Sequence, residues 1–155
     1  MISEAVDETD SKIIGELRRN GRATYSELGR KVGLSPHAVA DRVRRLTDRG
    51  HIAGFEALID FAALGRALDA LVDVRLLPAT SPDEFEQRVA KLPTVRELLF
   101  VTGRFDYLLR LACRDADDLD KTVRVLRQEA GAAVTETRVV LRSSRHEPEI
   151  HDLAR

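Results

Sequence analysis

The sequence predicts an α+β protein in which an N-terminal winged helix-turn-helix precedes a ferredoxin-like βαββαβ domain. Three short helical patterns with capping signals fill the first fifty residues, and strand-like and helical patterns then alternate up to residue 141. The 155 residues are 43% hydrophobic and 33% charged, with only 9 Gly and 5 Pro. Such a composition supplies a hydrophobic core and few chain breakers, which excludes collagen-like and low-complexity classes.

The first two helices are predicted from apolar spacing and from a capping signal. Apolar residues at helical spacing indicate a helix over residues 8–19, which an Asn-Gly pair ends. Thr24 and Glu27 have the spacing at which a hydroxyl and a carboxylate cap each other's free backbone amides. A second, short helix therefore begins after Thr24 and ends at Gly33.

A third helix follows almost at once. Ser35 accepts a hydrogen bond from an unpaired amide and Pro36 fits the first helical turn, so the helix begins there and ends near Gly50. Two helices separated by a tight break at Gly33 are typical of a helix-turn-helix.

Strand-like and helical patterns alternate after Gly50. The expected elements are a strand and linker over residues 52–60, a strand over 68–77, a helix opened by Ser81-Pro82, strands over 95–102 and 105–113, a helix over 115–129 and a strand over 134–141. The βαββαβ order places two helices on one face of a four-stranded sheet. Because residues 98–101 are apolar on both alternating sets, we expect the open face to pack on another copy of the chain. A monomer whose sheet has one solvated face is the alternative.

Positive charge is concentrated in one part of the chain, although the formal net charge is only -1. Residues 18–49 hold nine basic and three acidic residues, a local net charge of +6, whereas residues 61–155 hold 15 basic and 16 acidic ones. Such a patch suits a polyanion. A solvated helix face is the alternative.

In a helix-turn-helix the second helix of the pair enters the major groove of DNA, and its N-terminal residues meet base edges. The candidate DNA-binding residues are Arg22, Ser35, His37, Ala38, Asp41, Arg42, Arg44 and Arg45. We expect Arg42 and Arg45 to face outward and bind phosphate or guanine, because arginine can donate two hydrogen bonds to either. Asp41 is expected to pair with Arg45 at i+4 or to reject wrong bases.

The turn between the two central strands is a second candidate site. Gly103 can adopt positive φ or allow a ligand close to the backbone, and free amides there can bind a carboxylate. Asp106 can accept an ammonium group, so the turn suits a free amino acid. The alternative is a tight hairpin stabilised by the aspartate.

The sequence carries no recognisable catalytic or metal motif. The four histidines are scattered, the single cysteine cannot form an internal disulfide, and no nucleophile elbow, P-loop or dinucleotide-binding glycine motif is present. We therefore predict no catalytic residue, no metal and no cofactor. The acidic N-terminus does not resemble a signal peptide, and no apolar run is long enough to span a bilayer, so we expect a cytoplasmic protein without membrane contact.

The sequence resembles the Lrp/AsnC family, the feast/famine regulators of bacteria and archaea, from about Asp10 to Arg142. The matching segments are Asp10 to Ile14 with Leu17, Asn20 to Arg22, Glu27-Leu28, Val32 to Pro36, Arg42 to Leu46, Gly50 to Ile52, Val101 to Leu108 and Thr135 to Leu141. Thr9 departs from the Leu that is common in the family, and the residues after Arg142 match no part of the pattern.

The resemblance implies a DNA-binding helix-turn-helix over residues 1–51, a hinge strand and linker over 52–64, a ligand-binding (RAM) domain over 65–143 that also forms oligomers, and a tail over 144–155. It also implies dimers that assemble into tetramers or octamers, with amino-acid effectors bound between RAM domains. The residues implied at the effector site are Val101, Thr102, Gly103, Arg104, Phe105 and Asp106, with Thr135 and Thr137 contributed by a neighbouring subunit. Arg104 either favours an acidic or polar effector or points to solvent.

The leading hypothesis is a regulator whose oligomer binds promoter DNA and responds to an amino acid. One alternative is an architectural protein that binds DNA with little sequence preference. The other is an enzyme, because sirohaem decarboxylases resemble the same architecture and hold an acidic tetrapyrrole with basic and histidine side chains.

Overall fold

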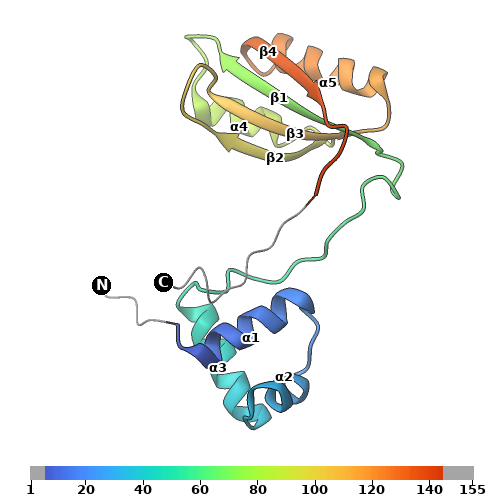
Figure 1. The fold of residues 1–155 in the computed structure, drawn as a ribbon. Helices are drawn as coiled ribbons and strands as arrows, with labels where there is room; N and C mark the ends of the chain where they lie inside the picture. Colours follow the sequence, from blue (N-terminus) through green and yellow to red (C-terminus); the bar gives the residue numbers. More distant parts are fainter. Residues whose placement is uncertain (1–5, 145–155) are drawn as a thin grey trace. The chain divides into compact units, whose positions relative to one another are not determined.

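The computed structural model describes residues 6–144, which form two compact units with a boundary between Leu58 and Ile59 (Figure 1). Each unit has its own hydrophobic core, and no buried residue is shared between the two cores. The boundary lies inside the segment 52–64 that the sequence analysis assigns to a linker.

The first unit is a bundle of three helices. They are α1 (Glu8–Arg19), α2 (Tyr25–Val32) and α3 (Pro36–Asp48), which confirms the three predicted helices. Their buried apolar side chains form the core of this unit, namely Ile13, Leu17, Leu28, Val39, Val43, Leu46 and Ile52. The capping box of α2 is formed as predicted: the Thr24 amide donates to Glu27 Oε2 at 2.7 Å, and the Glu27 amide donates to Thr24 Oγ1 at 3.2 Å.

Two glycines allow the tight turn between α2 and α3. Gly33 ends α2 with a φ of 72°, the left-handed conformation that glycine adopts without steric cost. Gly29 lies one turn earlier, where a Cβ atom would stand 2.5 Å from the backbone oxygen of Leu34. The Leu34 amide donates to the Gly29 oxygen at 3.0 Å, so the missing side chain lets the chain fold back on α2.

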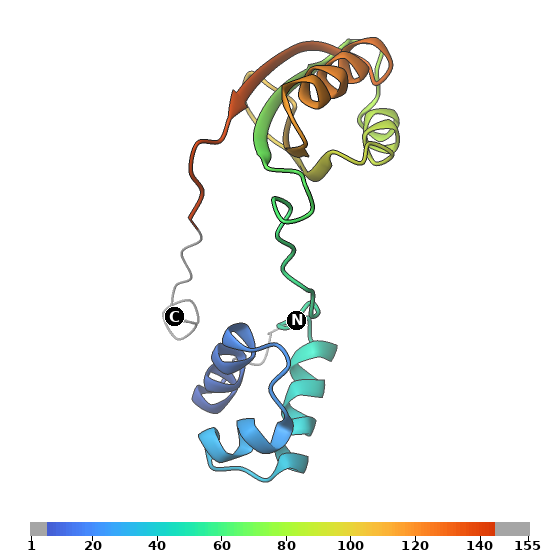
Figure 2. The same cartoon turned by 90° about the vertical axis from the view of Figure 1, so that its right-hand side faces the viewer.

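The second unit contains the predicted βαββαβ order. Its elements are β1 (Leu68–Leu76), α4 (Pro82–Val89), β2 (Val95–Phe100), β3 (Tyr107–Cys113), α5 (Ala116–Gln128) and β4 (Ala132–Val139). The strands pair antiparallel in the order β2-β3-β1-β4, and α4 and α5 cover the same face of the sheet (Figure 2).

The strand register assigns each residue to one face of the sheet. Val72 pairs with Leu109 on one side and with Thr137 on the other. Val72 and Leu109 are fully buried beneath the helices. Their sequence neighbours point the opposite way because side chains alternate along a strand. The open face therefore carries Leu71, Asp73, Leu99, Leu108, Arg110, Val134, Glu136 and Arg138.

The predicted wing and the predicted hinge strand are not found in the described chain. Residues 51–60 form no strand, and a turn follows in which the Arg66 amide donates to the Phe61 oxygen at 2.8 Å. A strand needs a neighbouring backbone to receive its ladder hydrogen bonds, and no described segment pairs with residues 52–60. The apolar pattern of this segment is therefore not sufficient to form a strand without a neighbouring backbone.

The end of the linker is fixed to the second unit. Arg66 Nη1 donates to the Ala112 oxygen at 3.0 Å and lies 3.6 Å from Asp118 Oδ2. The Arg96 guanidinium stands 4.1 Å from the centroid of the Phe61 ring, a cation–π contact. The turn over residues 61–66 is thus part of the second unit.

Candidate nucleic-acid interface and effector turn

The start of α3 is capped as the sequence predicts. Ser35 Oγ accepts from the Ala38 amide at 3.2 Å, and Pro36 occupies the first turn. Val39 and Val43 are buried in the core of the first unit, which leaves His37 and its outward neighbours on the free side of the helix. The predicted candidates Ser35, His37, Arg44 and Arg45 are exposed, and Ala38 and Asp41 are partly exposed.

Asp41 has partners other than the predicted Arg45. Its Oδ1 accepts a hydrogen bond from Arg44 Nη2, and its Oδ2 lies 3.5 Å from His37 Nε2. Residues three or four positions away on either side are neighbours on a helix surface, and Asp41 contacts one on each side. The Arg45 side chain is left without that partner.

Arg42 does not face outward, and that prediction is corrected. Its Nη1 donates to Asp7 Oδ2 at 2.6 Å and to Asp10 Oδ1 at 2.7 Å, and only 24% of the side chain is exposed. The first turn of α1 packs beside the middle of α3, which brings together residues more than thirty positions apart in the sequence. The Arg42 guanidinium lowers the pKa of Asp7 below its ordinary value.

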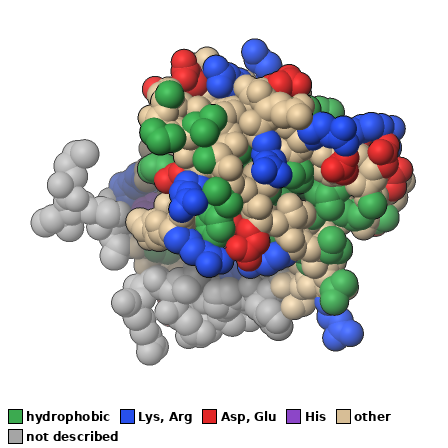
Figure 3. Space-filling model, turned by 90° about the horizontal axis from the view of Figure 1, so that it is seen from above, with side chains coloured by type: hydrophobic (Ala, Val, Ile, Leu, Met, Phe, Trp, Pro, Cys, Tyr) green, Lys and Arg blue, Asp and Glu red, His purple; other side chains and the backbone are tan. Residues whose placement is uncertain are grey.

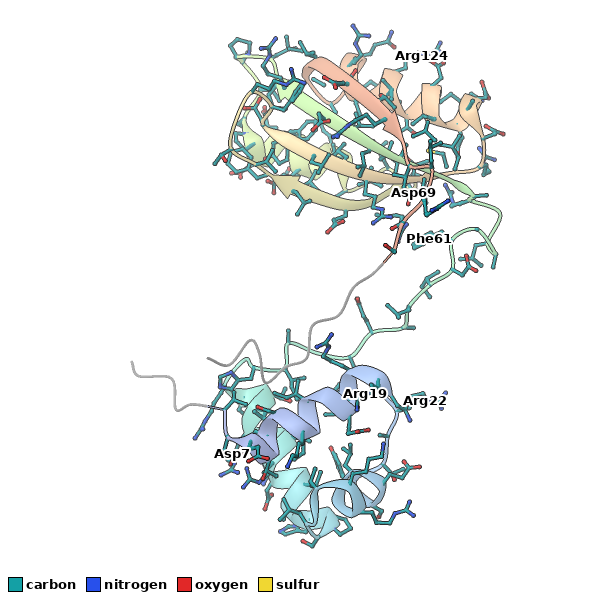
Figure 4. All side chains as sticks on the ribbon, in the orientation of Figure 1. Asp7, Arg19, Arg22, Phe61, Asp69 and Arg124 are labelled. Carbon is teal, nitrogen blue, oxygen red and sulfur yellow. The ribbon has the colours of Figure 1, made fainter. Side chains whose placement is uncertain are left out.

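Arg22 and Arg45 are the free cations among the predicted DNA-binding residues. Both side chains are exposed, and neither forms an ion pair with another residue of the range 6–144. Figure 4 shows Arg22 beyond the C-terminal end of α1, pointing away from the helices. Each of these two exposed guanidinium groups can attract a phosphate group.

The effector turn, defined as residues 101–106, joins β2 to β3. Gly103 has a φ of 117°, as the sequence analysis anticipated for this position. The Val101 amide donates to the Asp106 oxygen at 2.8 Å and closes the turn. One carboxylate oxygen of Asp106 is already engaged, because its Oδ2 accepts from the Leu76 amide at 2.7 Å. Asp106 therefore fixes the turn to β1.

Arg104 does not simply point to solvent. Its Nη2 donates to Glu136 Oε2 at 2.9 Å, and its guanidinium lies 4.8 Å from the centroid of the Phe105 ring. The positive charge of Arg104 is thus compensated by a carboxylate on β4.

Thr135 and Thr137 do not join the effector turn within one chain. They flank Glu136 on β4 and pair with Val74 and Val72, so their side chains lie on the helix-covered side of the sheet. Glu136, which contacts Arg104, lies on the open side.

Ion pairs cross the open face of the sheet. Arg110 donates two hydrogen bonds to Asp69, from Nε at 3.1 Å and from Nη2 at 2.6 Å, and Arg138 donates to Asp73. These pairs depend on strand register, so they cannot be predicted from spacing along the sequence. Figure 3 shows another view of the molecule in which basic and acidic side chains are interspersed among hydrophobic ones.

Nothing among residues 6–144 resembles a metal centre, since no group of three His, Cys, Asp or Glu side chains there could hold an ion. Cys113 is buried, and burial raises the pKa of its thiol. His146 and His151 lie outside the described residues. No helix in the described range is long and apolar enough to cross a membrane.

Comparison with known proteins identifies both units. Residues 6–47 match the AsnC-type helix-turn-helix domain, and residues 69–150 match the Lrp/AsnC ligand-binding domain. The chain belongs to the Lrp/AsnC family of transcriptional regulators. The match of its ligand-binding domain continues past Arg142, so the expectation that the sequence after this residue lies outside the family pattern is wrong.

Relatives of this Lrp/AsnC protein cover most of its length. An HTH-type transcriptional regulator of Pyrococcus furiosus is 37% identical over 127 residues, which are 81% of this chain and 82% of the relative. The leucine-responsive regulatory protein of Haemophilus influenzae is 36% identical over 143 residues, 90% of this chain and 86% of the relative. The crystal structure of a Neisseria meningitidis transcriptional regulator in complex with L-methionine superposes with a TM-score of 0.85 at 30% identity, covering 92% of this chain and 94% of that one.

Proposed function

We propose that this Lrp/AsnC regulator binds promoter DNA through α3 as an oligomer, and that an amino acid bound between RAM domains tunes its affinity for DNA. The observation that carries the proposal is a helix-turn-helix unit with two exposed arginines that form no ion pair with residues 6–144, in one chain with the ligand-binding domain of the family. Because an effector shifts an equilibrium only by its different affinity for two states, we expect it to bind one arrangement of the subunits more tightly.

Within the DNA interface, we assign base contacts to the start of α3 and phosphate contacts to the free arginines. Ser35, His37 and Ala38 lie where a recognition helix meets base edges. Arg22 and Arg45, which have no ion-pair partner in the described part of the chain, supply guanidinium groups for phosphates. Asp41 and Arg44 hold each other on the same face, which suits a contact that selects among bases.

Within the effector site, we assign the carboxylate of the amino acid to the free amides of the effector turn. The complex of the Neisseria regulator with L-methionine supports an amino acid as the effector class. The charges nearest the turn are already engaged, Arg104 with Glu136 and Asp106 with the Leu76 amide. The effector ammonium then takes the second oxygen of Asp106 or a group of a neighbouring subunit, where we place Thr135 and Thr137.

Self-association is proposed through the open face of the sheet. Leu71, Leu99 and Leu108 lie there among the ion pairs, and Leu99 exposes 42% of its surface. Exposed apolar side chains grouped on one face favour burial of that face against a second copy of the chain. Dimers would form first and would assemble into tetramers or octamers. We place such a regulator in the cytoplasm, with the DNA, and we assign it no catalytic residue, metal or cofactor.

The test of the effector site is thermal unfolding of the purified full chain with each of the twenty amino acids. A ligand that binds only the folded state raises the midpoint by mass action. We expect one or a few amino acids to raise it, and Asp106→Ala to abolish the increase. An increase with none of them contradicts the amino-acid proposal, and binding of a tetrapyrrole instead would favour the decarboxylase-like alternative.

The test of the DNA interface is a titration with the duplex that the protein selects from a random-sequence pool. We expect Arg45→Ala to weaken binding and to lower the dependence of log K on log salt concentration by about one. Arg124→Ala removes the same charge from α5 in the other unit, where we place no DNA contact, and is the matched control. Equal affinity for the selected duplex and a scrambled one would favour the architectural alternative.

A further inference from the structure

An ion-paired cluster joins the first turn of α1 to the middle of α3. One nitrogen of Arg42 donates to a carboxylate oxygen of Asp7 and to one of Asp10. We call these three residues the α1–α3 cluster. Only 15% of the Asp10 side chain and 24% of the Arg42 side chain are exposed, so the contact lies largely between the helices.

The two oxygens of Asp7 have different partners. Its Oδ1 accepts from the Asp10 amide at 2.7 Å and caps α1, while its Oδ2 accepts from Arg42. Asp10 in turn reaches Arg42 with its own carboxylate. The cap of α1 and the middle of α3 are therefore fixed to each other through one guanidinium, which restrains rotation of α3 about its axis.

The charge of the cluster disfavours contact with DNA at Arg42. Two carboxylates face one guanidinium, so the local net charge is negative, whereas a phosphate ligand needs an uncompensated donor. Both hydrogen bonds come from Nη1, and the carboxylates that accept them would place two negative charges beside any phosphate bound to Arg42. Arg45 lies one turn further along α3, is exposed, and has no carboxylate partner within residues 6–144.

We propose that Arg42 is a positioning residue for DNA recognition: it fixes α3 against α1 through Asp7 and Asp10, and it makes no contact with phosphate. This inference rests on the proposed DNA-binding function. The cluster sets the rotation at which His37, Arg44 and Arg45 are presented to the groove. Loss of the cluster then lowers the affinity for the selected sequence and leaves binding to arbitrary DNA, which depends on charge alone, in place.

The substitution Asp10→Asn separates this proposal from its electrostatic opposite. It removes a negative charge from the DNA-binding unit, which by simple electrostatics strengthens binding to a polyanion. If the carboxylates only masked Arg42 from DNA, the same substitution would free the arginine and strengthen binding further. If Arg42 is a positioning residue, Asp10→Asn should instead weaken binding to the selected duplex.

The matched control is Glu8→Gln. Glu8 lies in the same first turn of α1 and carries the same charge, but it pairs with Lys12 at 2.7 Å and makes no hydrogen bond to α3. It therefore reports the effect of charge without the effect of the cluster.

The experiment titrates the full-length wild type, Asp10→Asn, Glu8→Gln, Arg42→Lys and Arg42→Ala with the selected duplex and with a scrambled duplex of the same length. We expect Asp10→Asn to weaken binding to the selected duplex about ten-fold and to leave binding to the scrambled one unchanged or slightly tighter. Glu8→Gln should not weaken either. Arg42→Lys should recover part of the loss of Arg42→Ala, with the salt dependence of wild type in both.

Two results would overturn the proposal. Tighter binding of the selected duplex by Asp10→Asn would show that the carboxylates mask the arginine, and a salt dependence lowered by about one in Arg42→Ala would show a phosphate contact. Circular dichroism at the assay temperature establishes whether each variant is folded. If Arg42→Ala is unfolded, the affinities of Asp10→Asn and Arg42→Lys test the positioning role. Absence of DNA binding by the wild type would instead contradict the proposed function itself.

Discussion

The two units of the molecule differ in the partners of their arginines. In the first unit two exposed arginines, Arg22 after α1 and Arg45 on α3, have no acidic partner among the described residues, although Arg44 pairs with Asp41. In the second unit, Arg110 and Arg138 on the open sheet face each bind a carboxylate on the neighbouring strand β1, and Arg104 in the turn between β2 and β3 binds Glu136 on β4. A surface with free cations suits a polyanion, whereas one with paired charges and apolar side chains suits a second copy of the same surface. Arg42 in the first unit is also paired, but with two carboxylates of another helix and with only 24% of its side chain exposed, which indicates a structural role.

The largest expected effect is a loss of stability of the first unit alone. Gly29→Ala places a Cβ atom 2.5 Å from the Leu34 oxygen, and neither backbone segment can move without opening the turn between α2 and α3. We expect the free energy of unfolding of this unit to fall by about 3 kcal/mol. Chemical denaturation, followed by the circular dichroism signal of the helices, measures this change in the free energy of unfolding.

The control for this substitution is another helical glycine. Gly15 in α1 has no neighbouring atom within 4 Å of an added Cβ, so Gly15→Ala should stabilise the unit by up to about 1 kcal/mol, because alanine loses less entropy in a helix. Equal effects at the two positions would contradict the close approach described for Gly29.

The second prediction concerns the paired charges of the open face. Arg110→Glu places two carboxylates together where Arg110 now donates two hydrogen bonds to Asp69, which Figure 4 labels. If this face joins two copies, we expect the dimer dissociation constant to rise at least roughly ten-fold, because unpaired like charges are costly to bury. Sedimentation equilibrium measures the constant.

Arg124→Glu reverses a charge on the outer side of α5, where Arg124 pairs with Asp120, and should leave the constant unchanged. A dimer as tight as wild type in Arg110→Glu would place the interface on another surface.

The smallest expected effect is a pH dependence in the second unit. Asp118 binds Arg114 and Arg66, and the hydrogen bonds from Arg114 lower the pKa of this carboxyl to about 2. The pKa of Asp118 is lower in the folded state than in the unfolded state. The ionised carboxylate therefore adds to the free energy of unfolding above about pH 4, and this contribution is lost as the pH falls toward about 2. We expect it to amount to about 1 kcal/mol, since Arg114 is largely exposed.

Acid unfolding of the second unit checks this contribution. Asp118→Asn should be less stable than wild type at neutral pH, with the difference shrinking below pH 4. Asp117→Asn removes a neighbouring carboxylate that pairs only with an exposed lysine, and it should change stability little. A difference for Asp118→Asn that stays constant down to about pH 2 would contradict the assigned shift.

The sequence predicted what local interactions determine. Caps such as Thr24 with Glu27 and Ser35 with the Ala38 amide are formed by residues three positions apart, so the helices begin where the pattern indicates. The alternation of apolar residues likewise predicted the strands and the βαββαβ order.

The features that sequence reasoning missed depend on residues distant in the chain. The bond from Arg42 to Asp10 joins positions 32 apart, and the bond from the Leu76 amide to Asp106 joins positions 30 apart. Neither can be read from spacing, because each is set by helix packing or strand register. The strand expected over residues 52–60 failed for a related reason, since an alternating pattern does not supply the partner backbone that a strand requires.

The anchored end of the linker has a geometric consequence for operator recognition. Ile52 belongs to the core of the first unit, and Phe61 is held by Arg96 in the second. Only the eight residues between them, 53–60, are left to connect the units, and fully extended they span about 30 Å. The length of residues 53–60 therefore sets the maximum separation between the helix-turn-helix unit and the ligand-binding domain of the same chain. If the chain binds DNA as the proposed oligomer, this length limits how far each DNA-binding unit can be displaced to reach its half-site.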